Sequence, residues 1–163
     1  MFEDGARAAI KLRLNLGADN LPIRANRKLK LPERDYGDVD FAFIWKGVLI
    51  NLELKSWQKT PEYFRGDFKA VDNRQKELEK QLMTKATPRG YKLQELLSKE
   101  KPSLSIFGTL TFLCVADVEY VSPQYQNLWY GDVPRALTPA EIVELLTDRP
   151  RFEHVLNAAG IHK

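Results

Sequence analysis

The sequence predicts an α/β protein in which helices flank a mixed β-sheet. Apolar segments at residues 39–45 and 48–55 flank a two-residue turn at 46–47, which is typical of an antiparallel hairpin. A helical region, residues 60–101, separates this hairpin from a nearly continuous apolar segment, residues 104–116. Strands joined through a helix usually run parallel, so the second hairpin strand and the later apolar strand are expected to be parallel neighbours.

The elements before the hairpin are expected to be a helix and an extended segment. Apolar residues recur among basic ones across residues 2–16, and Gly17 follows them, which favours a helix. Residues 21–31, LPIRANRKLKL, favour a strand or an extended arm that Pro32 closes.

The helical region of residues 60–101 is expected to form two pieces. Thr60 and Pro61 are typical of the N-cap and first position of a helix. The stretch DNRQKELEKQLMTKA places leucines four residues apart among charged residues, which indicates an amphipathic helix. The PRG sequence at residues 88–90 is expected to break this helix before YKLQELLSKE.

The C-terminal region is expected to contribute one short strand and two helices. NLWYGD, residues 127–132, favours a short edge strand. TPAE, residues 138–141, is a capping box ahead of the helical sequence IVELL. RFEHVLNAA, residues 151–159, favours a last helix.

Length and composition favour one globular domain, residues 1–163. Apolar residues make up 44% of the chain and charged residues 29%, as in folded proteins. No segment reaches the roughly 20 apolar residues of a membrane helix, and the acidic start MFED is unlike a signal peptide. The single cysteine, Cys114, excludes an internal disulfide and a multi-cysteine zinc site, and it fits a cytoplasmic location.

Charge is distributed unevenly along the chain. Residues 1–34 contain eight basic and four acidic residues, and residues 55–101 contain twelve and seven. The hairpin region between them, residues 35–54, has one basic and four acidic residues. An acidic hairpin between basic segments is the pattern expected of a metal site beside a phosphate-binding surface. The alternative is solvated charge on helix faces.

The hairpin brings several polar side chains together. Residues two apart in a strand share a face, so Asn51, Glu53 and Lys55 are expected to project from one side of the sheet. A turn at 46–47 sets Asp40 opposite Glu53, with Cβ atoms about 4.5–5.5 Å apart. Two carboxylates and one ammonium group therefore converge.

Two carboxylates this close need a cation or a proton between them. Mg²⁺ accepts one or two carboxylates with water and carbonyl oxygens, so Asp40, Glu53 and the backbone carbonyl of Leu54 are its candidate ligands. Lys55 is placed to orient a water molecule or to stabilise developing negative charge. These groups suit hydrolysis of a phosphodiester by a metal-bound water.

The stretches GDVD (37–40), LELKSW (52–57), NRQKELEKQL (73–82) and LTFLCVAD (110–117) resemble the PD-(D/E)xK nuclease superfamily, and within it the nuclease-related (NERD) domains. The resemblance covers about residues 5–117, with residues 118–163 as a C-terminal strand and helices. It implies a restriction-endonuclease-like fold and a DNA-cleaving enzyme that uses Mg²⁺ or Mn²⁺.

The resemblance also implies a role for individual residues. Asp40 and Glu53 would hold the metal, Lys55 would be catalytic, and Gln75 would line the cleft and contact substrate from the following helix. Families of this kind carry a Glu after a glycine in the first helix, whereas Ala6 follows Gly5 in this chain.

The third metal ligand and the partners of the protein are open at this point. Glu3 and Asp4 precede Gly5, and either could substitute for the usual Glu, with Glu3 as a candidate metal ligand, or the third carboxylate could be absent. The implied partner is DNA, with RNA as an alternative. A second copy of the chain is another candidate partner. The chain has no Walker A loop, so an ATP-driven motor would be a separate protein.

Other interpretations stay open at this point. The acidic and basic hairpin residues could form a cross-strand salt-bridge cluster, and the fold could be a catalytically inactive module that binds nucleic acid or a protein. DVD at residues 38–40 could be a D-x-D sugar-nucleotide site, although no phosphate-binding glycine loop accompanies it. Trp57 and Tyr63, which follow the second hairpin strand, are candidates for stacking on bases.

Overall fold

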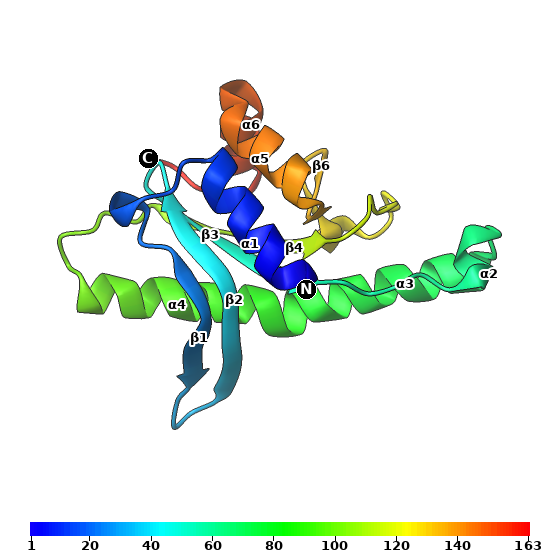
Figure 1. The fold of residues 1–163 in the computed structure, drawn as a ribbon, viewed down its shortest axis with the longest axis horizontal. Helices are drawn as coiled ribbons and strands as arrows, with labels where there is room; N and C mark the ends of the chain where they lie inside the picture. Colours follow the sequence, from blue (N-terminus) through cyan, green and yellow to red (C-terminus); the bar gives the residue numbers. More distant parts are fainter.

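A five-stranded mixed sheet with helices on both faces forms the centre of the protein (Figure 1). The computed structural model describes the backbone of residues 1–163 and every side chain except those of residues 24–26. The strands are β1 (Ile23–Lys30), β2 (Asp35–Trp45), β3 (Val48–Lys55), β4 (Gly108–Val115), β5 (Trp129–Tyr130), β6 (Val133–Pro134) and β7 (Ala136–Leu137). The helices are α1 (Phe2–Arg13), α2 (Pro61–Phe64), α3 (Phe68–Gln81), α4 (Thr87–Glu100), α5 (Pro139–Thr147) and α6 (Arg149–Ala158). Shorter turns are η1 (Ala18–Asn20), η2 (Leu82–Ala86) and η3 (Gln126–Leu128).

The sheet order is β1-β2-β3-β4-β7, and β5 and β6 form a separate two-stranded ribbon. Strands β1, β2 and β3 are antiparallel neighbours. Strand β4 lies parallel to β3, with Val48 opposite Gly108 and Lys55 opposite Val115. The predicted α/β class and the parallel crossover are therefore confirmed.

Helices cover both faces of the sheet, as Figure 1 shows. On one face, buried side chains of α1, α5 and α6 pack on apolar side chains of β2, β3 and β4, among them Phe41, Leu52 and Phe112. On the other face, α3 and α4 pack through residues such as Leu78 and Leu93. Asn51 and Glu53 of β3 lie on this second face, where residues of the α3–α4 helix contact them.

The helix that covers the second face does not break where the sequence predicted. It runs from α3 into α4 through a single π-helical turn, η2 (Leu82–Ala86). Pro88 lacks an N–H and its ring crowds the carbonyl four residues earlier, that of Thr84. That carbonyl accepts a hydrogen bond from Arg34 Nη2 at 2.8 Å instead. The chain absorbs the proline as a bulge, a feature that often lies at functional sites.

Gly90 lets α4 approach the sheet closely and does not end the helix. A Cβ atom at Gly90 would lie 2.7 Å from Thr111 Oγ1 and 2.8 Å from Asn51 Nδ2. Asn51 in turn donates to the carbonyl of Ala86 at 3.0 Å. The PRG sequence therefore shapes a close helix–sheet contact, and the prediction of a helix break was wrong.

Two predicted helix starts are confirmed by their caps. Thr60 Oγ1 accepts from the Tyr63 amide at 3.2 Å at the start of α2. At α5, the Glu141 amide donates to Thr138 Oγ1 at 3.3 Å and Glu141 Oε1 accepts from the Thr138 amide at 2.9 Å.

The remaining elements differ mainly at their ends. Residues 23–30 form a strand, helix α1 ends at Arg13, and β4 begins at Gly108, after four residues that were expected to belong to it. None of the helices described here combines the length and apolar character that a membrane crossing requires.

Candidate active site

The β2–β3 turn fixes which residues face each other across the hairpin. Lys46 and Gly47 both have positive φ, 50° and 80°, as a two-residue type I′ turn requires. The pairing that follows runs from Trp45 opposite Val48 to Phe41 opposite Leu52. The backbone pairing ends there, so the predicted pair of Asp40 and Glu53 is not part of it, and the Leu54 amide donates to Asp40 Oδ2 at 2.9 Å.

Glu53 lies almost wholly inside the protein, 4% exposed, and both of its carboxylate oxygens have partners. Its Oε2 accepts a hydrogen bond from Arg89 Nη1. Its Oε1 accepts from Gln81 Nε2 at 3.2 Å and lies 3.3 Å from Lys55 Nζ. The buried charge of Glu53 is therefore compensated by two cations and an amide, which is the condition for burying a carboxylate.

Asp40 is half-buried and less well compensated. Its Oδ2 accepts a hydrogen bond from the Leu54 amide at 2.9 Å. Burial, and then the negative charge of Glu53, raise the pKa of Asp40 to about 6, against the Leu54 hydrogen bond and the positive charge of Lys55. The charges of the two carboxylates therefore act on each other. The negative charge of Asp40 is only partly compensated by Lys55, whereas that of Glu53 is compensated.

Helix α1 supplies further charges beside Asp40. Arg7 Nη1 donates to the Asp40 carbonyl at 3.2 Å, and its Nη2 contacts Asp4 Oδ1 at 2.6 Å. The negative charge of Glu3 also contributes to the raised pKa of Asp40, as the smallest of its causes. Glu3 therefore lies on the side of the site where the sequence suggested a further ligand.

Lys55 is more accessible than the carboxylate it contacts. Its side chain is 27% exposed, against 5% for Glu53. Its Nζ lies 5.7 Å from the centre of the Trp57 ring as well as beside Glu53. An ammonium group in this position faces both the buried carboxylate and the solvent-accessible side of the site.

Arg89 and Gln81 are the contacts of Glu53 that sequence reasoning missed. Arg89 is 7% exposed, and its Nε also donates to the Tyr36 carbonyl at 2.7 Å. Its path passes Gly37, whose φ is +81° and where a Cβ atom would lie 2.8 Å from Arg89 Nη2. The glycine of the GDVD stretch therefore makes room for the guanidinium group that reaches Glu53.

The resemblance implied that Gln75 lines the cleft, but Gln75 is not among the residues that line it, and Gln81 is the glutamine that contacts Glu53. Gln75 is buried, and its Oε1 accepts from the Ser122 amide at 2.5 Å, so it holds the loop after β4. Six residues of helix separate the two, about 9 Å along the axis. Six positions also turn the side chain by about 120° around the helix axis, so the two glutamines face different neighbours.

The oxygen atoms of Asp40 and Glu53 determine whether a divalent metal ion can bind at this site. Asp40 and Glu53 offer the hard oxygen atoms that Mg²⁺ prefers, and two carboxylates suffice when water completes the coordination. Across the described residues, no three of the histidine, cysteine, aspartate or glutamate side chains lie together as a metal cluster, so Glu3 does not complete a three-carboxylate site. The residues fit an ion held by Asp40 and Glu53, with Arg89 as the neighbour whose contact would have to open.

Leu54, whose carbonyl was a predicted metal ligand, and Asn51 make hydrogen bonds within the protein. Leu54 contacts Asp40 through its amide N–H, and a role for its carbonyl stays a prediction. Asn51 shares the face of Glu53, as expected, and hydrogen-bonds Thr111 Oγ1 at 3.3 Å in the helix–sheet contact.

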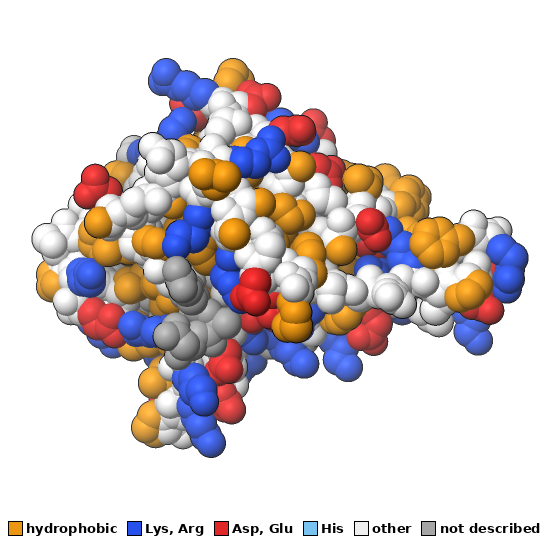
Figure 2. Space-filling view, in the orientation of Figure 1, with side chains coloured by type: hydrophobic (Ala, Val, Ile, Leu, Met, Phe, Trp, Pro, Cys, Tyr) orange, Lys and Arg blue, Asp and Glu red, His pale blue; other side chains and the backbone are white. Residues whose placement is uncertain are grey.

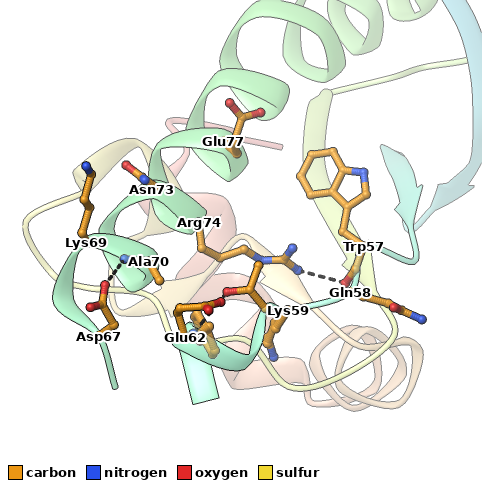
Figure 3. A pocket seen from close by; sticks show the side chains of 12 residues that line it. Trp57, Gln58, Lys59, Glu62, Asp67, Lys69, Ala70, Asn73, Arg74 and Glu77 are labelled. Carbon is orange, nitrogen blue, oxygen red and sulfur yellow. Dashed lines mark hydrogen bonds between the residues drawn. The ribbon is translucent and has the colours of Figure 1, made fainter. Parts of the chain in front are cut away.

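A cleft of about 550 Å³ opens next to this cluster, between the segment after β3 and helices α2 and α3 (Figure 3). Trp57 and Tyr63 line it together with Arg74, whose Nη2 donates to the Trp57 carbonyl at 3.3 Å. Asp40, Glu53 and Lys55 are not among its lining residues, and the link between them and the cleft is Trp57, whose ring centre lies 5.7 Å from Lys55 Nζ.

Comparison of the chain with family models, curated proteins and solved structures finds no match in any of the three. The assignment of a function therefore rests on the geometry of the site.

Proposed function

We propose that this protein is a divalent-metal-dependent nuclease that hydrolyses DNA phosphodiester bonds. The observation that carries the proposal is the convergence of three side chains at the open end of one hairpin. The negative charge of Glu53 contributes to the raised pKa of Asp40, and Lys55 Nζ lies 3.3 Å from Glu53 Oε1. Paired carboxylates beside an accessible ammonium group suit metal-assisted hydrolysis of a phosphodiester.

We further propose that the fold is restriction-endonuclease-like and that the chain is a PD-(D/E)xK nuclease. Two features support this assignment. An antiparallel β1-β2-β3 meander continues into a parallel β4 through the α3–α4 helix. The acidic residue Asp40 lies on β2, and the Glu53–Lys55 pair lies on β3, where β2 and β3 are hydrogen-bonded neighbours.

The residues take the following roles in this proposal. Asp40 and Glu53 hold Mg²⁺ or Mn²⁺, which when bound neutralises phosphate charge and lowers the pKa of a bound water. Lys55 orients the attacking water or stabilises the negative charge that develops on the phosphate. Arg7, anchored by Asp4 and the Asp40 carbonyl, adds positive charge where a phosphate would approach.

Cleavage assays test the proposal. Plasmid, linear and single-stranded DNA are incubated with Mg²⁺ or Mn²⁺ and with wild type or Glu53→Gln, which keeps the size of the side chain. We expect cleavage by wild type in metal, none in chelator, and a loss of at least about 100-fold in the variant. Lys99→Ala, an exposed lysine paired only with Glu95 at 3.1 Å on α4, is the matched control. Metal-dependent cleavage that survives in Glu53→Gln would refute the assignment.

One observation favours a second function, that of a catalytically inactive module that binds nucleic acid. Both carboxylate oxygens of Glu53 are occupied by Arg89, Gln81 and Lys55, so the site is electrically balanced without a metal. Calorimetry distinguishes the two functions. Heat of Mn²⁺ binding in wild type that is absent from Glu53→Gln supports the nuclease. No heat in either protein, with salt-sensitive DNA binding, supports the inactive module.

A further inference from the structure

The segment after β3 combines aromatic and basic side chains around the cleft next to Lys55. Residues 55–76 contain six basic and three acidic residues, so this stretch carries a net positive charge. Helix α2 and the first half of α3 extend away from the sheet, at the right of Figure 1. In Figure 2 hydrophobic and basic side chains lie next to each other over this extension.

The aromatic side chains occur both inside the cleft and on the helices beside it. Trp57 and Tyr63 line the cleft and are partly buried. Phe64 and Phe68 are 74% and 78% exposed, although large apolar side chains are usually covered. Phe64 lies edge-on to Tyr63, with ring centres 5.9 Å apart. Trp57 and Tyr63 thus lie in the cleft, Phe64 contacts Tyr63 from outside it, and Phe68 is exposed at the first position of α3.

The basic side chains near these rings differ in how far they are neutralised. Arg74 Nε lies 2.8 Å from Glu119 Oε1, and Lys59 Nζ lies 3.6 Å from Glu119 Oε2, so one acid is shared by two cations. Lys69 also lines the cleft, is exposed, and has no ion pair with any side chain the structure describes. Among the basic residues of the cleft, Lys69 is therefore the one whose charge is available to a phosphate.

We propose that this cleft binds single-stranded DNA and delivers it to Lys55. Bases stack on aromatic side chains while a positively charged groove follows the backbone, and this arrangement tolerates any sequence. Only an unpaired strand exposes the faces of its bases, so Phe64 and Phe68 can stack on single strands and not on a duplex. The volume of about 550 Å³ is that of a small-ligand site, which suits a few unstacked nucleotides.

The inference rests on the proposed nuclease, because it assigns the substrate form of the same site. A position for the strand over Trp57 would bring its phosphates to Lys55, whose Nζ is 5.7 Å from that ring. Glu62, Asp67 and Glu77 also line the cleft, as many acidic as basic residues, so the phosphates would have to follow Lys55 and Lys69 at its edge.

Binding in chelator tests the inference without requiring cleavage. Fluorescence anisotropy measures the affinity for a labelled oligothymidine and for a duplex of the same length, with EDTA present. We expect tighter binding of the single strand, and about a tenfold loss of affinity for each of Phe64→Ala and Phe68→Ala. Lys69→Ala should reduce the slope of log K against log salt by about 0.7.

Exposed residues elsewhere provide matched controls, and the outcomes separate this inference from the proposed function. Tyr91→Ala, an aromatic residue 61% exposed on α4, should bind as wild type does. Equal affinity for both forms of DNA, or unchanged binding by both phenylalanine variants, would overturn the inference even if the protein cleaves DNA. Single-strand binding that depends on Phe64 and Phe68 would uphold it even if no cleavage occurs.

Discussion

Ionised Asp40 lowers the free energy of unfolding of the protein. It is half-buried near the charge of Glu53, and the pKa of Asp40 is raised to about 6 from 3.8. A carboxyl group whose pKa is higher in the folded state binds its proton more tightly there. Its ionisation therefore destabilises the fold, fully above about pH 6, and the penalty disappears as the pH falls towards 3.8.

Replacing this residue should stabilise the protein at neutral pH. Asp40→Asn keeps an oxygen for the Leu54 amide and removes the charge, so we expect a gain of about 1–2 kcal/mol at about pH 8, after allowance for solvent screening. The gain should vanish at about pH 4. Urea unfolding at both pH values measures it. Asp38→Asn, at an exposed site on the same strand, is the control and should change little. A loss of stability for Asp40→Asn at high pH would contradict this account of the site.

Arg89 should stabilise the fold through Glu53. Arg89→Met leaves a buried carboxylate with only Gln81 and Lys55, and breaking a buried pair costs about 3–5 kcal/mol. Mg²⁺ should restore stability to this variant more than it stabilises wild type, because the ion can take the vacated place. Thermal unfolding with and without Mg²⁺ provides the measurement. Arg27→Met removes an exposed pair with Glu100 and should cost less than about 1 kcal/mol. Equal effects of Mg²⁺ on wild type and Arg89→Met would argue against a metal at Glu53.

At the scale of the elements, the contact between α4 and the sheet positions Arg89. The π-helical turn η2 places Pro88 where its missing N–H is tolerated, and Gly90 then lies against Asn51 and Thr111. Arg89, between them, is held in a fixed position next to Glu53. The π-helical turn and the close approach at Gly90 therefore place Arg89 at the site.

Gly90→Ala should be strongly destabilising, although alanine is the better helix former. The new Cβ would lie 2.7 Å from Thr111 Oγ1, so we expect a loss of about 2 kcal/mol or more. Gly5→Ala on α1 is the matched control. Nothing lies within 4 Å of a Cβ there, so its helix propensity should add up to about 1 kcal/mol. Chemical denaturation of both variants compares them directly, and a stabilised Gly90→Ala would show that α4 does not lie this close to the sheet.

The hairpin was predictable from sequence because its information is local. The two-residue turn set the register from Trp45–Val48 to Phe41–Leu52, and strand alternation placed Lys55 beside Glu53. The predicted pair of Asp40 with Glu53 lies beyond the end of this pairing, where the Asp40 side chain accepts from the Leu54 amide. Arg89 was not predictable, because PRG reads locally as a helix break. The helix continues through this sequence because Arg34, which is distant along the chain, donates a hydrogen bond to the Thr84 carbonyl. The short strand β7 was missed for a similar reason, since two residues carry no periodicity and β4 defines it by pairing.

Across the whole molecule, the sheet separates an apolar core from the charged site. Cys114, in β4, lies fully buried in the core formed with α1, α5 and α6, and burial raises the pKa of its thiol to about 12. We expect it to resist thiol reagents at about pH 8 in the native protein and to react at the rate of global unfolding. Labelling followed by mass spectrometry across a urea series measures this. Rapid labelling without denaturant would contradict the described packing of this core.

The measurement that tests the central claim most directly is DNA cleavage by Lys55→Ala, together with its Mn²⁺ affinity. Lys55 is partly exposed and is not a proposed ligand, so its loss should leave the fold and the metal site in place. The account predicts Mn²⁺ binding as in wild type and cleavage slower by at least about 100-fold. Cleavage by Lys55→Ala at the wild-type rate would show that the hairpin cluster is not the active site.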